Sequence, residues 1–190
     1  MPNWCNNSIT IRHKDPAMIQ RVLDAKEGVL GEFLPCPKEL TDTVAGHLGD
    51  GYAQELNQAK MALNLKYYGA KDWYDWQVAN WGTKWDITFD SVERMDDNTV
   101  QASFDSAWSP PVNAYEKLCA LGFEIEAYYN EPGMAFCGKW SGNEDSFDDD
   151  YYEYSGENSE TVREVIGDEL DDYFGISEDM KQWEEECEDQ

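Results

Sequence analysis

The sequence predicts an α+β fold over residues 1–140, followed by an acidic and partly helical C-terminal extension over residues 141–190. Two observations support this prediction. Apolar residues alternate in several short stretches, as in strands with one buried face, and between these stretches they recur with the period of an amphipathic helix. The charge also divides the chain, because the extension holds 20 of the 40 acidic side chains but only 2 of the 14 basic ones.

The first predicted elements are a strand and a helix. Residues 8–12 alternate and include β-branched side chains, which is typical of a strand. Asp15 and Pro16 predict a helix start, because aspartate caps free N–H groups and proline already has the φ angle of a first helical residue. We expect Gly28 to end this helix, and residues 33–37, which contain two prolines, to form an extended connector.

Residues 41–70 are predicted to be an insertion. Its first part contains three glycines and is expected to be a loop. A helix carrying Leu56, Leu63 and Tyr67 is expected to follow the loop.

Half of the eight tryptophans lie in residues 73–89. The first three recur at helical spacing up to Trp81, and Gly82 is the expected helix cap. From Trp85 the apolar period changes to two, which predicts a strand over residues 85–89. Two interpretations are open: the indoles pack in the core, or they form a partly exposed aromatic and amide site.

The rest of the domain is predicted to add three strands and a helix. In chain order these are a turn at 96–98, a strand at 100–104, a helix from 109–111 to Gly122, a strand at 123–129, a type II turn at 130–133 and a short strand at 134–140. Without the insertion and the last strand, the order is βαββαβ. This order predicts a ferredoxin-like sheet.

The C-terminal extension is expected to begin at a linker, residues 141–143. Residues 148–154 are acidic and aromatic without a clear period, and they lack the ladder of a calcium-binding loop. A helix is predicted from Ser159 to Gly175, and a last short helix carries Met180 and Trp183. The apolar face of the longer helix consists of Val162, Val165, Ile166, Leu170, Tyr173 and Phe174.

Five stretches carry a resemblance to a known family. They are Met-Pro-Asn-Trp-Cys-Asn-Asn at 1–7, Pro-Cys-Pro-Lys-Glu-Leu at 35–40, Asn-Trp-Gly-Thr-Lys-Trp-Asp at 80–86, Ala-Trp-Ser-Pro-Pro at 107–111, and Tyr-Asn-Glu-Pro-Gly with Phe-Cys-Gly at 129–138. Through them, residues 1–140 resemble the YubB-type ferredoxin-like family of plasmid and phage proteins. The resemblance implies a ferredoxin-like fold and an origin in a mobile element, but no reaction or ligand.

Cysteine usage and hydropathy point to the cytoplasm of the host cell. The five cysteines contain no Cys-x-x-Cys pair and, with two histidines, match no zinc-site spacing, so we expect free thiols and no metal or cofactor. No apolar stretch reaches membrane-spanning length, and the N-terminal residues do not resemble a signal peptide.

No constellation of catalytic residues is apparent, so we expect a protein that is not an enzyme. His13 and His47 are isolated, and Cys5 and Cys36 are more typical of buried apolar positions than of nucleophiles. Glu131 is expected in an ordinary turn.

The net charge of −26 opposes direct binding of nucleic acid or anionic membrane and favours a basic partner. Duplex DNA has one charge per about 1.7 Å of axis, and a helix rises about 1.5 Å per residue, so an acidic helix can mimic the phosphates. The first hypothesis is therefore an inhibitor that fills the basic groove of a host defence protein, such as a nuclease. Its expected partner-binding residues are Glu160, Glu164, Asp168, Glu169, Asp171 and Asp172. The alternative is a solvated surface that only maintains solubility.

A second hypothesis is a nucleotide-like ligand bound at the tryptophan-rich stretch. Stacking is worth about 1–3 kcal/mol per base, and a lysine can contact a phosphate. The expected ligand-binding residues are Trp4, Asn80, Trp81, Lys84, Trp85 and Trp108.

Overall fold

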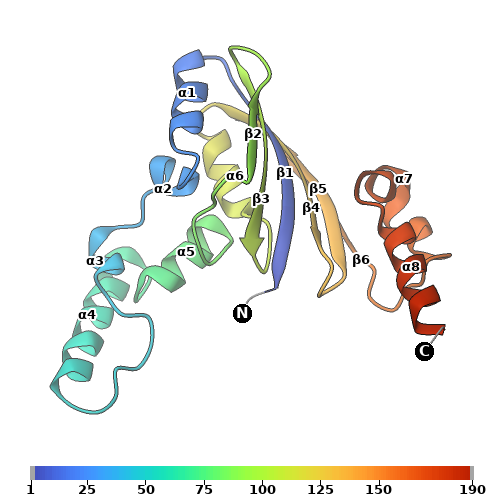
Figure 1. The fold of residues 1–190 in the computed structure, drawn as a ribbon. Coiled ribbons are helices and arrows are strands. Elements are labelled where there is room, and N and C mark those ends of the chain that lie inside the picture. Colours follow the sequence, from blue (N-terminus) through green and yellow to red (C-terminus); the bar gives the residue numbers. More distant parts are fainter. Residues whose placement is uncertain (1–2, 189–190) are drawn as a thin grey trace.

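The computed structural model describes residues 3–188, in which six strands form one antiparallel sheet of order β2-β3-β1-β4-β5-β6 (Figure 1). The strands are β1 (Trp4–His13), β2 (Ser91–Arg94), β3 (Thr99–Ala107), β4 (Phe123–Glu131), β5 (Phe136–Gly142) and β6 (Phe147–Glu153). The first four have the order of a ferredoxin-like sheet, so the predicted α+β fold class is confirmed.

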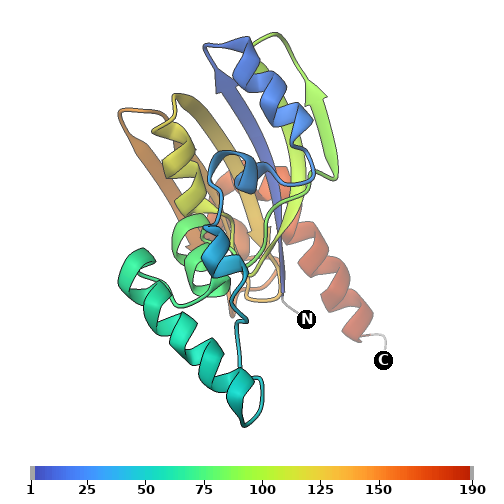
Figure 2. The same cartoon turned by 90° about the vertical axis from the view of Figure 1, so that its left-hand side faces the viewer.

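Helices lie on both sides of the sheet. They are α1 (Pro16–Asp24), α2 (Val29–Phe33), α3 (Lys38–Thr41), α4 (Tyr52–Tyr68), α5 (Trp73–Trp81), α6 (Val112–Cys119), α7 (Val162–Phe174) and α8 (Ile176–Glu188). Helices α1, α2, α5 and α6 lie on one side, and α7 and α8 lie on the other (Figures 1 and 2).

Each side of the sheet has its own apolar core. The larger core lies under α1 and α6, where alternate residues of β1 such as Ile9 and Ile11 pack against Phe104 and Ile125. The smaller core joins Cys137 of β5 to the apolar side chains of α7 and α8. Its buried members are Cys137, Tyr154, Val162, Ile166, Leu170 and Ile176. The buried face of β1, β3 and β4 fixes the register of these central strands.

The start of α1 is as predicted, but its end is not. Asp15 accepts a hydrogen bond from the Ala17 N–H at 2.9 Å, and Pro16 is the first helical residue. The helix ends at Asp24, and Gly28 instead precedes α2, a helix that the sequence did not predict and that includes Phe33. The extended connector is therefore shorter than expected.

The extended segment 85–89 is not a strand, because its polar groups bond to the loop before α2 and to α2 itself. The Asp86 carboxylate accepts from Leu30 N–H at 2.8 Å and Gly31 N–H at 2.7 Å, and Phe89 N–H donates to the Lys26 carbonyl. Ladder pairing begins only at β2.

The turn after β4 is also different from the predicted type II turn. That turn needs a positive φ at Gly133, but the positive φ of 55° belongs to Ala135. The Glu131 carboxylate is buried and accepts from Gly133 N–H at 3.0 Å and Met134 N–H at 2.6 Å. A carboxylate therefore organises the turn, instead of a glycine.

The expected linker at 141–143 is instead the end of β5 and the start of a hairpin. The acidic stretch beyond it forms β6, which pairs with the whole of β5. Edge strands are exposed on both faces, so their residues show no clear apolar period.

The insertion forms an arm that projects away from the sheet (Figure 1). In α4 the buried side chains are Asn57 and Asn64, which bond to the polypeptide before the helix, and Leu56, Leu63 and Tyr67 are exposed. The polar face of this helix therefore docks by hydrogen bonds, and its apolar face lies open.

Candidate binding surfaces

Two loops at one end of the sheet present a group of aromatic side chains. Thr83 and Ala107 bond reciprocally, because the Thr83 hydroxyl donates to the Ala107 carbonyl at 3.0 Å and accepts from the Ala107 N–H at 3.1 Å. The Ser109 hydroxyl also donates to the Gly82 carbonyl at 2.8 Å. These bonds hold the two loops in a fixed arrangement.

The two loops contribute Lys84, Trp85 and Trp108 to what we call the aromatic cluster, which Trp4 and Tyr74 complete. The Lys84 Nζ lies 4.6 Å from the ring centroid of Trp85, 5.3 Å from that of Trp108 and 5.8 Å from that of Tyr74. Trp4 packs against Trp85 with 5.9 Å between their ring centroids. The cluster thus holds a cation among ring faces, an attractive arrangement.

The cluster is open to solvent. Trp4, Trp85 and Trp108 are 45%, 39% and 40% exposed. Trp108 also has a φ of 70°, a backbone conformation that costs free energy in a bulky residue and is concentrated at functional sites. For these three indoles, the structure favours the exposed-site interpretation.

Asn80 and Trp81 do not join the cluster, so the structure does not bring them together with the other predicted ligand-binding residues. Trp81 is in the core, and its Nε1 donates to the Leu34 carbonyl at 3.0 Å. Asn80 accepts from the Lys117 ammonium at 2.6 Å. Tyr74 was missed, because no local pattern indicates that it meets a loop thirty residues further along the chain.

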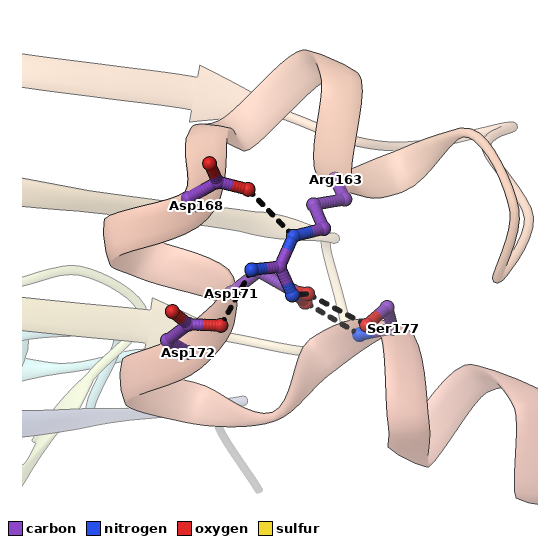
Figure 3. A network of polar contacts seen from close by, with 5 residues as sticks. All are labelled: Arg163, Asp168, Asp171, Asp172 and Ser177. Atoms are coloured by element: carbon purple, nitrogen blue, oxygen red, sulfur yellow. Dashed lines mark hydrogen bonds and ion pairs between the residues drawn. The ribbon is translucent and has the colours of Figure 1, made fainter.

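Three of the predicted partner-binding carboxylates instead hold their own helix together (Figure 3). Arg163 contacts Asp168 at 2.6 Å, Asp171 at 2.9 Å and Asp172 at 2.6 Å. Asp171 is buried and also accepts from the Ser177 N–H and hydroxyl, at the start of α8. This network ties α7 to α8, and the single positive charge of Arg163 offsets one of the three negative charges that it contacts.

The helical spacing of the predicted partner-binding carboxylates is also interrupted in α7. Gly167, with φ 82° and ψ 163°, breaks the helix between Glu164 and Asp168, and Glu160 lies before the helix begins. Glu169 forms an ion pair with Lys139 at 2.6 Å, and this contact lowers the pKa of Glu169. Asp168 and Asp172 therefore keep the helical i, i+4 spacing, but they are not in one continuous helix with Glu160 and Glu164.

Other carboxylates are exposed and form no ion pair within residues 3–188. They lie on β6 and α8: Asp148, Asp149, Asp150, Glu153, Glu178, Asp179, Glu185 and Glu186. The sequence showed that this segment is acidic. Only the pairing of β6 with β5 shows that four of these eight carboxylates lie on an edge strand of the sheet.

An open groove joins the aromatic cluster to β6. It is lined by Trp108 from the cluster, by Met134 and Phe136, and by Tyr151 and Glu153 of β6. Met134 and Tyr151 are largely exposed. Aromatic, methionine and acidic side chains therefore form one continuous surface. The sequence did not predict this surface, because these residues are far apart along the chain.

Neither Cys5 nor Cys36, the two cysteines considered as possible nucleophiles, has an activated thiol. Burial raises the pKa of the Cys5 thiol far above its usual range and raises the pKa of Cys36 to about 11. A protonated thiol is a poor nucleophile. In the part of the chain described, no group of three or more His, Cys, Asp or Glu side chains has metal-binding geometry.

Within residues 3–188, none of the helices combines the length and the apolar character needed to cross a membrane. Comparison with curated proteins gave no match. A family model described as the ferredoxin-like domain in Api92-like protein matches residues 81–171. The crystal structure of Api92 from Yersinia pseudotuberculosis is similar, with a TM-score of 0.48 and 14% identity, over 83% of this chain and 99% of that one.

The family model names a ferredoxin-like domain, as the resemblance implied, but it names Api92-like proteins and not the YubB-type family. Residues 81–171 contain β2 to β6 and most of α7. Five of the six strands therefore lie in the part of the chain that matches the ferredoxin-like domain of Api92-like proteins.

Proposed function

We propose that the protein is a non-enzymatic inhibitor of plasmid or phage origin, which binds a basic, nucleic-acid-handling protein in the cytoplasm of the host cell. The observation that supports this proposal is the continuous surface made by the aromatic cluster, the groove and β6. Indole and methionine side chains form its centre, and carboxylates without ion pairs form its acidic side.

Protein interfaces combine these features. Tryptophan, tyrosine and methionine are enriched where partners meet, and a few such side chains supply most of the binding free energy. The hydrogen bonds between the two loops hold Trp85 and Trp108 in place, so little conformational entropy is lost on association. The net charge of −26 attracts a basic surface and accelerates encounter.

The carboxylates of β6 lie on an unbroken strand, whereas Gly167 interrupts the helix that carries those of α7. Alternate strand residues share a face and are about 6.6 Å apart, about twice the roughly 3.4 Å of axis per phosphate along one DNA strand. Asp148 and Asp150 share such a face and are exposed. Mimicry of nucleic acid therefore rests on the edge strand, in place of the acidic helix expected from the sequence.

Capture of the partner from a host lysate at about 0.05 and 0.5 M salt tests the proposal, because a contact between exposed charges weakens at high salt. The captured protein is purified and its affinity measured for two variants, Trp85→Ala with Trp108→Ala, and Asp148→Asn with Asp150→Asn and Glu153→Gln. Both should weaken binding by at least about tenfold.

A matched control removes three exposed charges elsewhere, Glu27→Gln, Asp42→Asn and Asp97→Asn. It should bind within about twofold of the parent, because exposed charges far from the interface contribute little to binding. Equal losses in the control and in the β6 variant would contradict a defined acidic site. Unchanged binding in both surface variants would contradict the proposal.

One observation favours a second candidate, a flat anionic ligand. The Lys84 ammonium lies among three rings and has no carboxylate within ion-pair distance in the described residues. A nucleoside monophosphate could stack on an indole and bond to this ammonium. Titration should quench tryptophan fluorescence, and Lys84→Gln should remove the preference over the uncharged nucleoside. No preference in the parent would rule this candidate out.

A further inference from the structure

Strand β6 is an edge of the sheet that remains open. It pairs with β5 on one side and, among residues 3–188, has no strand neighbour on the other. All of its side chains are exposed except that of Tyr152, which is half-buried on the face that α7 contacts. It contains no proline or lysine, residues that often block edge strands.

The register shows which backbone groups point outward. Beyond the two ends of the ladder, Tyr154 N–H donates to the Ala135 carbonyl at 2.8 Å and Asn143 N–H donates to the Ser146 carbonyl at 2.9 Å. Hydrogen-bonded and non-bonded pairs alternate along an antiparallel ladder. The even-numbered residues of β6 therefore bond to β5. The outward N–H and C=O groups belong to Phe147, Asp149, Tyr151 and Glu153.

The side chains of β6 determine which kind of incoming strand can pair with the outward N–H and C=O groups. On the face of the larger core, Phe147 stacks on Trp140 with 6.1 Å between centroids, and Tyr151 packs against Phe136 at 5.4 Å. The opposite face carries Asp148 and Asp150. A second copy of β6 would bring like charges together, whereas an incoming strand with basic residues would meet opposite charges.

We propose that β6 binds an extended, lysine- and arginine-rich segment of a partner protein as a seventh strand of the sheet. The segment alternates, with apolar residues beside Phe147 and Tyr151 and basic residues beside Asp148 and Asp150. Main-chain hydrogen bonds supply affinity, and the alternating side chains supply specificity. This inference rests on the proposed function and specifies how the basic partner is held.

The test uses the full chain and a synthetic peptide of alternating lysine and valine, followed by amide hydrogen exchange. On binding, exchange should slow at Phe147, Asp149, Tyr151 and Glu153, whereas the amides of Asp148, Asp150 and Tyr152 are already bonded to β5. A peptide with glutamate in place of lysine should not bind, because its charges repel those of β6.

Tyr151→Pro removes one outward donor without removing a bond to β5 and is tolerated at a sheet edge. It should weaken peptide binding by about tenfold, whereas Tyr151→Leu, which keeps the N–H, should bind within about threefold of the parent. Unchanged exchange elsewhere in the sheet confirms that the proline variant is folded.

If a saturating concentration of the lysine–valine peptide does not slow exchange at the four odd-numbered amides of the parent protein, the inference is overturned. If the basic peptide binds in a charge-dependent way but leaves these amides exchanging, strand addition is wrong and the proposed function stands. If the purified partner binds independently of β6 and the aromatic cluster, the proposed function itself fails.

Discussion

At the scale of single residues, Trp81 and Trp85 differ in role although they are four positions apart. Trp81 is 2% exposed and bonded to Leu34, and Trp85 is 39% exposed beside Lys84. The helix ends between them at Gly82, whose φ of 85° redirects the chain. Spacing alone treats the two indoles alike, because the turn that separates them decides which one is buried.

Alanine substitution should separate these roles. Trp81→Ala should lower the free energy of unfolding by about 3–5 kcal/mol, because it leaves a cavity in the core. Trp85→Ala should cost about 1 kcal/mol or less, because this side chain is already 39% exposed to water and loses less apolar burial. Urea denaturation measures both, and similar losses would contradict the exposed aromatic cluster.

Asp171 provides a second residue-scale prediction. Asp171→Asn weakens the contacts to Arg163 and Ser177 in a buried position and should cost about 1–3 kcal/mol. Asp172→Asn, in the same network but exposed, should cost much less. Thermal unfolding of the two variants compares them, and equal stability would show that the network does not support α7.

Thiol chemistry provides a third prediction at the scale of single residues. The cysteines are free, with Cys187 exposed and Cys5, Cys119 and Cys137 buried. Burial raises the pKa of Cys119 to about 11 and that of Cys137 to about 12, which suppresses their thiolates. A thiol reagent should label Cys187 first in the native protein and all five cysteines after denaturation. Fewer than five would indicate a disulfide.

At the scale of elements, the sequence predicted those whose signals are local. The Asp15 cap of α1, the Gly82 cap of α5 and the alternation of β1 depend on neighbouring residues. Helix α2 could not be predicted in this way, because its N–H groups bond to Asp86, more than fifty positions later. Strand β6 was missed because neither of its faces is buried enough to impose a period.

The contact between α7 and the sheet should depend on pH. Lys139, with the Tyr128 hydroxyl, lowers the pKa of Glu169, so this carboxylate stabilises the folded protein while it is ionised. That contribution is present above the ordinary glutamate pKa of 4.5 and is lost as pH falls through the lower folded value. The stability difference between the parent and Glu169→Gln should therefore shrink below about pH 4.5. A difference that stays constant down to pH 3 would contradict this contact.

At the scale of the whole molecule, the sequence indicated the two kinds of side chain in the candidate surface, aromatic and acidic. It did not indicate that they lie side by side. It identified exposed indoles as one possibility and the acidic extension as another, and it assigned the acidic role to α7. Folding places the aromatic cluster beside β6 through a groove, and it uses three of the α7 carboxylates to hold Arg163. Such neighbourhoods depend on sheet order, which no local pattern encodes.

At the same scale, the net charge supports the proposed preference for a basic protein over nucleic acid. A net charge of −26 repels phosphates over a Debye length of about 8 Å at physiological salt, and the acidic groups of β6 and α8 strengthen this field locally. Under the proposed function, these carboxylates would occupy the phosphate sites of a nucleic-acid-binding protein.

Competition with DNA tests this central claim most directly. The captured partner is titrated with this protein in the presence of increasing duplex DNA, at several salt concentrations, by fluorescence anisotropy. The account predicts that DNA displaces the protein, and that affinity falls steeply as salt rises, because both ligands use the same basic groove. Simultaneous binding of DNA and this protein, with an affinity unchanged across the salt range, would contradict the account.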